Sequence, residues 1–251
     1  MRILITGAAG GIGSATVAAL RDHDVIGLDV ADCDVRDQAS VDAAVSGAIA
    51  RLGGLDVLIN CAGLGTPQSA GARPDEDALE VLDVNLLGVW RVTAAALPAL
   101  LESRGRVVNV ASGLAVVTLP FSTAYTLSKR AVVAYSDVLR LEYGDRITVT
   151  SVYPGYIRTP IHERSRAAGV ALEGAVPVER VEDAVRTLVR AALGRPVRDI
   201  ATTRSGAVAY RVLRFLPRGL VDRATRARLR SLARRGHFDG GIAREFGARL
   251  G

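Results

Sequence analysis

A glycine-rich turn near the N-terminus limits the folds open to this chain more than any other feature. The segment TGAAGGIG occupies residues 6–13, between the apolar run RILIT and an alanine-rich stretch. This order is typical of a strand, a tight turn and a helix. Bare glycines let the backbone approach a phosphate, and a helix N-terminus favours negative charge. We therefore expect a βαβ unit that binds a dinucleotide at Gly7, Gly11 and Gly13, with Ile12 between them.

Strand and helix patterns alternate along the rest of the chain. Strands are predicted at 1–7, 24–30, 55–60, 106–112, 146–154 and 198–203, and helices at 11–21, 40–52, 75–103, 121–143 and 181–193. This alternation predicts an α/β fold, a doubly wound parallel sheet of the Rossmann-like kind with helices on both faces. The loop from Asp29 to Asp34 is too short for a crossover helix. The sheet is therefore expected to be shortened after its second strand, with residues 33–35 extended.

Composition separates a body, residues 1–203, from a C-terminal extension, residues 204–251. The 49% hydrophobic and 23% charged content excludes disordered and disulfide-scaffold chains. Two cysteines, Cys33 and Cys61, are too few for a metal site, so we expect no metal, free thiols and a cytoplasmic protein. The body is predicted to be one Rossmann-like domain that contains the dinucleotide-binding turn.

The C-terminal extension is strongly basic. It holds twelve arginines against three acidic residues, and leucines at near-helical spacing predict two amphipathic helices broken at Pro217. These helices are expected to dock on the body, with contact to an anionic membrane surface as the second possibility. Nucleic-acid binding is not expected, because aromatic residues make up only 4% of the chain and no base-reading module accompanies the charge.

Asp29 ends the second predicted strand, about 20 residues after the glycine-rich turn. A carboxylate at this position accepts hydrogen bonds from the adenosine ribose and repels a 2′-phosphate, and no arginine lies near the turn. NAD is therefore expected rather than NADP. The alternative is that Asp29 only caps the turn that follows it.

Lys129 is the only lysine among 32 basic residues, which marks a place where an ammonium group is required. Tyr125 precedes it by four residues on a predicted helix, so both side chains face the same way. A nearby ammonium and a positive nicotinamide ring both favour a phenolate. Tyr125 is thus a candidate general acid and base for proton transfer.

These motifs together resemble the short-chain dehydrogenase/reductase family over residues 1–203. The family pattern Thr-Gly-x-x-x-Gly-x-Gly falls on residues 6–13, Asn-Asn-Ala-Gly on 60–63, Tyr-x-x-x-Lys on 125–129 and Pro-Gly on 154–155. The resemblance implies a catalytic tetrad. Ser112 would orient the substrate oxygen, Tyr125 would transfer the proton, Lys129 would hold the nicotinamide ribose, and Asn85 of VNLLG would anchor a water relay.

The resemblance also implies further contacts with the cofactor. Asp34 and Val35 would line the adenine, Ile157 and Thr159 would meet the carboxamide, and the remaining contacts would come from Asn60, Ala62, Gly63 and Pro154. Two departures stand out: Cys61 replaces the second asparagine of Asn-Asn-Ala-Gly, and the helix after the second strand is missing. The second resembles members of the family with a shortened stretch there.

The expected reaction is hydride transfer between NAD and a secondary alcohol or a ketone or aldehyde, with small-molecule alcohols and ketones as partners. Apolar candidates for a pocket that takes a lipophilic or steroid-like substrate are Leu114, Val116, Leu119, Tyr156, Ile161, Val170 and Leu172. A homodimer or homotetramer is expected through the two longest helices. The alternative hypothesis is a nonenzymatic dinucleotide-binding sensor or scaffold that binds its partners through the basic extension.

Overall fold

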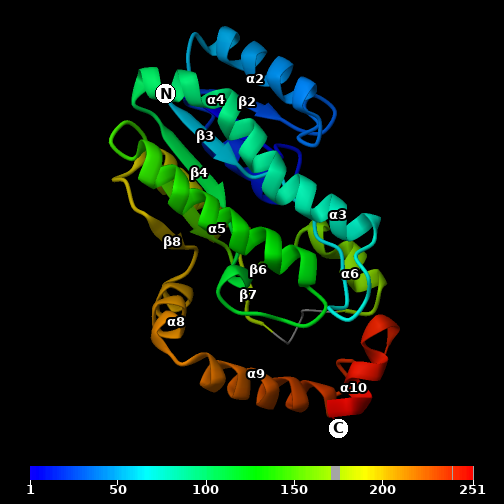
Figure 1. The fold of residues 1–251 in the computed structure, drawn as a ribbon. Coiled ribbons are helices and arrows are strands. Elements are labelled where there is room, and N and C mark those ends of the chain that lie inside the picture. Colours follow the sequence, from blue (N-terminus) through cyan, green and yellow to red (C-terminus); the bar gives the residue numbers. More distant parts are fainter. Residues whose placement is uncertain (171–175, 239, 251) are drawn as a thin grey trace.

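The computed structural model describes residues 1–170, 176–238 and 240–250, and Figure 1 shows their path. The strands are β1 Arg2–Thr6, β2 Asp24–Leu28, β3 Val57–Asn60, β4 Arg106–Val110, β5 Thr148–Tyr153, β6 Tyr156–Ile157, β7 Val178–Glu179 and β8 Asp199–Ala201. The α-helices are α1 Gly11–Ala19, α2 Gln38–Leu52, α3 Glu76–Leu82, α4 Val89–Ser103, α5 Thr123–Tyr143, α6 Glu163–Ala167, α7 Val181–Leu193, α8 Arg204–Phe215, α9 Arg218–Ala233 and α10 Arg244–Leu250.

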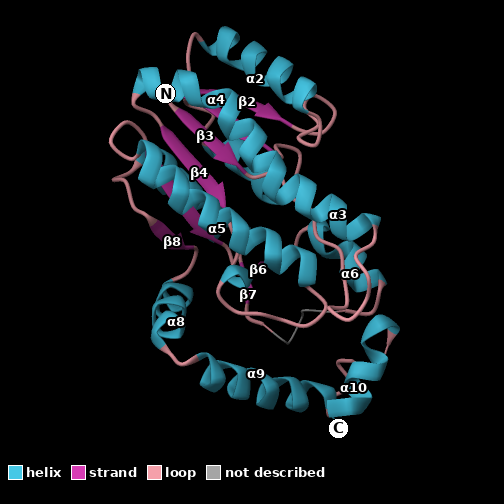
Figure 2. Cartoon of the chain, viewed as in Figure 1, coloured by secondary structure: helices cyan, strands magenta, loops and turns pink. Residues whose placement is uncertain are grey.

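A parallel sheet in the order β2-β1-β3-β4-β5-β8 forms the centre of the body. Helices α2, α4 and α5 cover one face of it (Figure 2), while α1 and α7 pack together on the other face. Side chains alternate along each strand, so Leu4 packs on the first face and Ile3 and Ile5 on the second. The predicted Rossmann-like fold, with helices on both faces, is confirmed.

The sheet ends at β2, which has only β1 beside it. The chain passes from β2 through one short loop into α2, whose first residue is preceded by the capping side chain of Asp37. The shortened edge is therefore confirmed. Residues 33–35 form no strand: Cys33 and Asp34 have no regular structure and Val35 lies in a turn, while Cys33 and Val35 are buried in the core with side chains of α2.

The segment 76–103 forms one long helix with a π-helical turn, Asp83–Gly88, between α3 and α4. A π-helical turn adds a residue to the winding and is frequent at functional sites. It carries the fully buried Asn85, whose side chain bonds to Leu64 in the loop after β3 and to Ser128 on α5. The helix is long and apolar enough to cross a membrane, but its buried side chains pack in the core of this fold, as those of a core helix do.

The C-terminal extension curves past the carboxyl ends of the strands (Figure 1). The break at Pro217 is found between α8 and α9, and a third helix, α10, follows. Leu229 and Leu232 are buried with Phe121 and Val170 of the body, and the Phe121 and Phe246 rings meet edge to face at 5.4 Å. The arrangement agrees with docking. Docking covers Leu229 and Leu232, so these two leucines are not available to a membrane surface.

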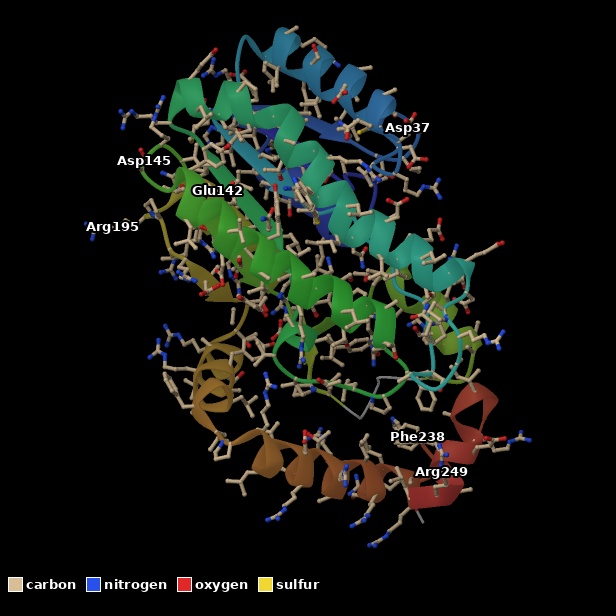
Figure 3. The ribbon with its side chains drawn as sticks, in the orientation of Figure 1. Asp37, Glu142, Asp145, Arg195, Phe238 and Arg249 are labelled. Atoms are coloured by element: carbon tan, nitrogen blue, oxygen red, sulfur yellow. The ribbon has the colours of Figure 1, made fainter. Side chains whose placement is uncertain are left out.

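Other parts of the C-terminal extension face solvent. Leu216 and Leu220 are exposed, and so are most of the arginines of α9 whose burial is described. Figure 3 shows nitrogen-tipped side chains along the side of α9 that points away from the sheet. Most arginines of α9 are thus exposed, while Leu229 and Leu232 are the leucines of this helix that are buried.

Candidate active site

A cavity of about 950 Å³ opens at the carboxyl ends of the strands, where ligands bind in doubly wound folds. It is lined by residues of the body and of the C-terminal extension. The predicted site residues that line it are Gly7, Gly11, Ile12, Gly13, Gly63, Ser112, Tyr125, Lys129, Pro154, Ile157 and Thr159. The fold therefore brings most of the predicted site together in one place.

The glycine-rich turn forms one end of this cavity. Gly7 has a positive φ of 70°, and a Cβ there would lie 2.6 Å from the Cα of Ala62. A Cβ at Gly13 would overlap the carbonyl oxygen of Gly7. Helix α1 begins at Gly11 with no capping side chain and no acidic residue in its first turn. Its first N–H groups are thus available for an anion, which fits a dinucleotide pyrophosphate.

Asp29 connects β2 to this turn. Its Oδ2 accepts a hydrogen bond from the Ala9 N–H at 2.7 Å, and its Oδ1 accepts one from the Val30 N–H at 2.9 Å. The carboxylate therefore does cap its own turn, as the alternative proposed, and also holds the glycine-rich turn. Each oxygen keeps capacity for a further hydrogen bond, because a carboxylate accepts about four.

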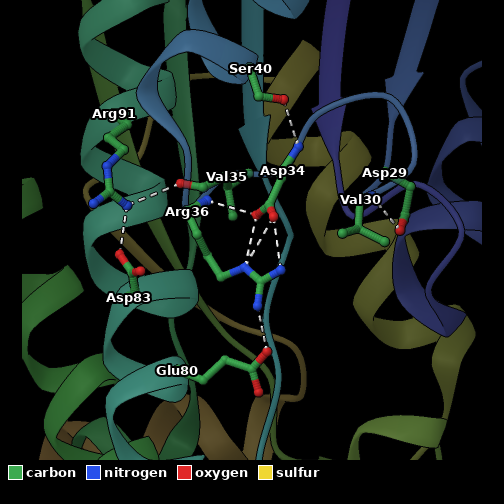
Figure 4. Close-up of polar contacts among 9 residues, drawn as sticks. All are labelled: Asp29, Val30, Asp34, Val35, Arg36, Ser40, Glu80, Asp83 and Arg91. Atoms are coloured by element: carbon green, nitrogen blue, oxygen red, sulfur yellow. Dashed lines mark hydrogen bonds and ion pairs between the residues drawn. The ribbon is translucent and has the colours of Figure 1, made fainter. Parts of the chain in front are cut away.

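The basic residue nearest to Asp29 in sequence is neutralised by acids (Figure 4). Arg36 forms an ion pair with Asp34 at 2.8 Å and another with Glu80 at 2.8 Å. The guanidinium lowers the pKa of Asp34 to about 2, mainly through a side-chain hydrogen bond. Arg36 is thus engaged by two carboxylates.

The other predicted cofactor contacts lie outside the cavity lining. Asn60 is buried, and its Nδ2 donates to Thr93 Oγ1 at 3.0 Å and to Asn109 Oδ1 at 2.8 Å, so it joins a polar network inside the core. Ala62 packs against Gly7. Val35 is buried against Gly88 of the π-helical turn. These residues do not line the cavity. They support the residues that do, through packing and hydrogen bonds within the protein.

Ser112 and Tyr125 lie together in the cavity. Ser112 caps a 3-10 turn, where its Oγ accepts a hydrogen bond from the Leu114 N–H at 3.1 Å. Burial raises the pKa of Tyr125, and a hydrogen bond with Ser112 opposes this. Lys129 was expected to lower that pKa. In the structure the cost of removing the phenolate from water exceeds any such effect, so the direction is upward.

Lys129 is 4% exposed, and its Nζ donates a hydrogen bond to the Val110 carbonyl at 2.9 Å. Burial lowers the pKa of Lys129 to about 8. The ammonium lies 5.7 Å from the centre of the Tyr125 ring. The two side chains predicted to act together therefore share one buried pocket.

Asn85 lies behind Lys129. Its Oδ1 accepts from the Leu64 N–H and its Nδ2 donates to the Leu64 carbonyl, both at 2.9 Å. Gly63 lies beside both groups: a Cβ there would be 3.2 Å from Asn85 Oδ1 and 3.5 Å from Lys129 Nζ. The asparagine thus holds the loop of Gly63 and Leu64, which lies next to Lys129. No hydrogen bond between Asn85 and Lys129 is present among the described contacts.

Glu179 is a functional position that sequence reasoning missed. Its Oε2 accepts from the Gly155 N–H at 2.8 Å and from Thr202, and its Oε1 accepts from Thr203 at 3.0 Å. One carboxylate thereby joins the Pro-Gly segment to Thr202 and Thr203, which directly precede the C-terminal extension. No motif pointed to it, because its partners are distant in sequence and two of them bind through hydroxyls that many positions carry.

Only some of the apolar residues predicted to form the substrate pocket line the cavity. Leu114, Leu119, Tyr156 and Ile161 line the cavity. Val170 is buried against α9 and Phe238 instead, Val116 does not line the cavity, and Leu172 falls outside the described residues. The C-terminal extension adds Ser205, Gly206, Ala209, Tyr210, Thr225 and Arg228, none of which was predicted. The lining of the cavity thus comes from both parts of the chain.

Comparison with known proteins decides the family. The model that describes short chain dehydrogenases matches residues 24–169. The chain belongs to the short-chain dehydrogenase family. Oxidoreductase UcpA of Salmonella typhimurium is 38% identical over 185 residues, which cover 64% of this chain and 70% of that protein. Because it belongs to this family, the short-chain dehydrogenase is an oxidoreductase.

Solved structures agree with this assignment. A short-chain dehydrogenase from Burkholderia cenocepacia in complex with NADP is 26% identical, with a TM-score of 0.73 over 88% of this chain and 95% of that one. A 3-ketoacyl-(acyl-carrier-protein) reductase from Brucella melitensis, complexed with NADH, has the same fold with a TM-score of 0.69 at 23% identity, over 79% of this chain and 94% of that one. Neighbours of this fold thus bind either nucleotide.

Proposed function

We propose that this short-chain dehydrogenase interconverts a secondary alcohol and a ketone or aldehyde with NAD(H), using Tyr125 as the general acid and base. One observation carries the proposal. Ser112, Tyr125 and the only lysine of the chain line the same cavity as the open N-terminus of α1. A buried lysine whose ammonium lies beside a tyrosine ring in a cavity is typical of a functional site.

Each residue has a defined task in this reaction. When bound, NAD(H) supplies the acceptor or donor of the hydride. The Ser112 hydroxyl donates a hydrogen bond to the substrate oxygen, and Tyr125 exchanges the proton with that oxygen. Lys129, with a pKa near 8, keeps its positive charge at neutral pH. That charge stabilises the phenolate that Tyr125 forms when it gives its proton to the substrate oxygen. The ammonium also suits the ribose hydroxyls of the nucleotide.

The choice of NAD over NADP rests on Asp29 and Arg36. Asp29 places a carboxylate next to the glycine-rich turn, where it accepts hydrogen bonds from ribose hydroxyls and repels a 2′-phosphate. Arg36 is engaged by Asp34 and Glu80 and so is not free to attract that phosphate. Both features favour the unphosphorylated nucleotide.

Replacing Asp29 tests this preference. We expect Asp29→Ala to weaken NADH binding by about tenfold, the cost of losing a charge-assisted hydrogen bond, and to leave NADPH binding equal or stronger. Fluorescence titration with each nucleotide measures both effects. Asp32→Ala, an exposed carboxylate in the same loop, is the control and should change neither affinity. Tighter binding of NADPH than NADH by the unaltered protein would contradict the assignment.

The cavity favours a lipophilic substrate. Its wall includes Leu114, Val117, Leu119, Ile161 and Ala209, and about 950 Å³ is enough for a drug-sized or steroid-sized molecule together with the nicotinamide end of a nucleotide. We propose a bulky hydrophobic alcohol or ketone as the substrate class.

We also propose a homodimer or homotetramer formed through α4 and α5. Trp90, Leu127, Val138 and Leu141 are each about half exposed or more on these helices, with Leu141 at 87%. Such exposed apolar side chains on adjoining helices are typical of a subunit interface. Light scattering is expected to give a multiple of 26.4 kDa, and Leu141→Glu is expected to shift it toward one chain. A monomeric unaltered protein would refute the proposal.

A further inference from the structure

The C-terminal extension sends one aromatic side chain into the active-site cavity. Tyr210, on α8, lines the cavity together with Ser112 and Tyr125. Its ring packs against Tyr153 with centroids 6.0 Å apart, and the Tyr153 hydroxyl donates to Asp199 at 2.8 Å. The ring of Tyr210 therefore rests on a side chain that is itself fixed, which gives its hydroxyl a defined position.

That position is next to the catalytic serine. A Cβ on Gly113 would overlap the hydroxyl oxygen of Tyr210, so the hydroxyl lies directly over this glycine. Gly113 follows Ser112 in sequence, and its N–H donates to the Pro154 carbonyl at 2.8 Å, which holds the backbone in place. Adjacent Cα atoms are about 3.8 Å apart, so Tyr210 lies one residue step from the backbone that carries Ser112.

The Tyr210 hydroxyl has no hydrogen-bond partner among the described residues. Burial and the negative charge of Glu179 raise its pKa to about 12, so it stays protonated and can donate. Apolar side chains line the cavity near it, including Leu114 and Ala209. The hydroxyl is open to the cavity, where an oxygen of a bound ligand can accept its hydrogen bond.

We infer that Tyr210 is a specificity-determining residue, whose hydroxyl donates a hydrogen bond to a second oxygen of the substrate, two or three bonds from the reacting carbon. The inference rests on the proposed function, because Ser112 defines where the reacting oxygen lies. It narrows the substrate class from hydrophobic carbonyl compounds to those with an oxygen-bearing substituent beside the reacting group.

Matched substrates test this inference with Tyr210→Phe, which keeps the ring and removes only the hydroxyl. The probes are cyclohexanol and decalin-2-ol, each paired with its vicinal diol. The unaltered protein is expected to oxidise the diols with a kcat/KM about tenfold above that of the mono-alcohols, the effect of one hydrogen bond. Tyr210→Phe is expected to abolish that preference, so that each diol and its mono-alcohol are oxidised with equal kcat/KM. Val212→Thr, on the exposed side of α8, is the control.

The outcomes separate this inference from the proposed function. Equal kcat/KM within every pair, or a diol preference that survives in Tyr210→Phe, would overturn the role of Tyr210 while leaving the oxidoreductase intact. Turnover of no probe would count against the proposed function; titration of the diols into the NADH complex then decides Tyr210 alone, since weaker binding by Tyr210→Phe supports its role and equal binding refutes it.

A second measurement tests the position of Tyr210 without any substrate. Gly113→Ala is expected to lower the Tm, because its methyl group overlaps the Tyr210 hydroxyl. In a Tyr210→Ala background the same substitution should lower the Tm much less, since the space is then open. Equal losses in the two backgrounds would show that the hydroxyl does not lie over Gly113.

Discussion

Tyr125→Phe is expected to reduce turnover by about 10³-fold, within the range that a positioned general acid and base contributes. The reason is that the phenyl ring keeps its place on α5 but has no proton to exchange with the substrate oxygen. NADH affinity should stay within about twofold, because the glycine-rich turn and Asp29 are untouched. Steady-state kinetics with alcohol and ketone, together with a fluorescence titration, measure both quantities.

The control for this variant is Tyr143→Phe, which removes a hydroxyl at the far end of the same helix. It should leave kcat and KM unchanged. A Tyr125→Phe protein that turned over at the unaltered rate would show that another group transfers the proton. Loss of NADH binding along with activity would instead indicate that the ring positions the nucleotide.

Lys129→Met is expected to lower kcat/KM by about 10²-fold, the usual effect of removing one preorganised charged donor from an active site. Its effect on stability should be small. Methionine fills a similar volume, and at pH 7 it removes a buried charge, which offsets the lost hydrogen bond to Val110. We expect a free energy of unfolding within about 1 kcal/mol of the unaltered protein at this pH, measured by denaturant titration.

The lowered pKa of Lys129 also predicts how the free energy of unfolding changes with pH. The pKa of Lys129 is about 8 in the folded protein and near 10.5 when exposed, so between these values the unfolded chain binds one more proton. The contribution of Lys129 to the free energy of unfolding therefore rises as pH increases from 8 to 10.5. In Lys129→Met this rise is absent. A variant whose stability follows the unaltered protein across that range would show that the lysine is not buried.

Much of the fold followed from local patterns. The helix over 181–193 begins and ends where the sequence predicts, because an apolar stripe and Gly194 define it. The short loop after Asp29 correctly predicted the missing edge of the sheet, since a crossover helix needs a dozen or more residues. Strand β2 ended earlier than expected, at Leu28, because Asp29 turns its carboxylate back to Ala9.

The site was predictable where a motif fixed it. The glycine-rich turn, Ser112, Tyr125 and Lys129 line one cavity because their spacing along strands and helices brings them to the same edge of the sheet. Tertiary contacts decided the rest. The π-helical turn that buries Asn85, the carboxylate of Glu179 that holds Gly155, and the approach of Tyr210 to Gly113 all join distant segments, and no local pattern encodes such a contact.

The measurement that tests the central claim most directly is transfer of label from NADH that carries deuterium at both C4 positions to a panel of steroid, aliphatic and aromatic ketones. The account predicts that the product alcohol carries one deuterium on its carbinol carbon and that one NAD⁺ forms for each alcohol. Tight binding of NADH with no transfer to any ketone would contradict it and would favour a nonenzymatic dinucleotide sensor.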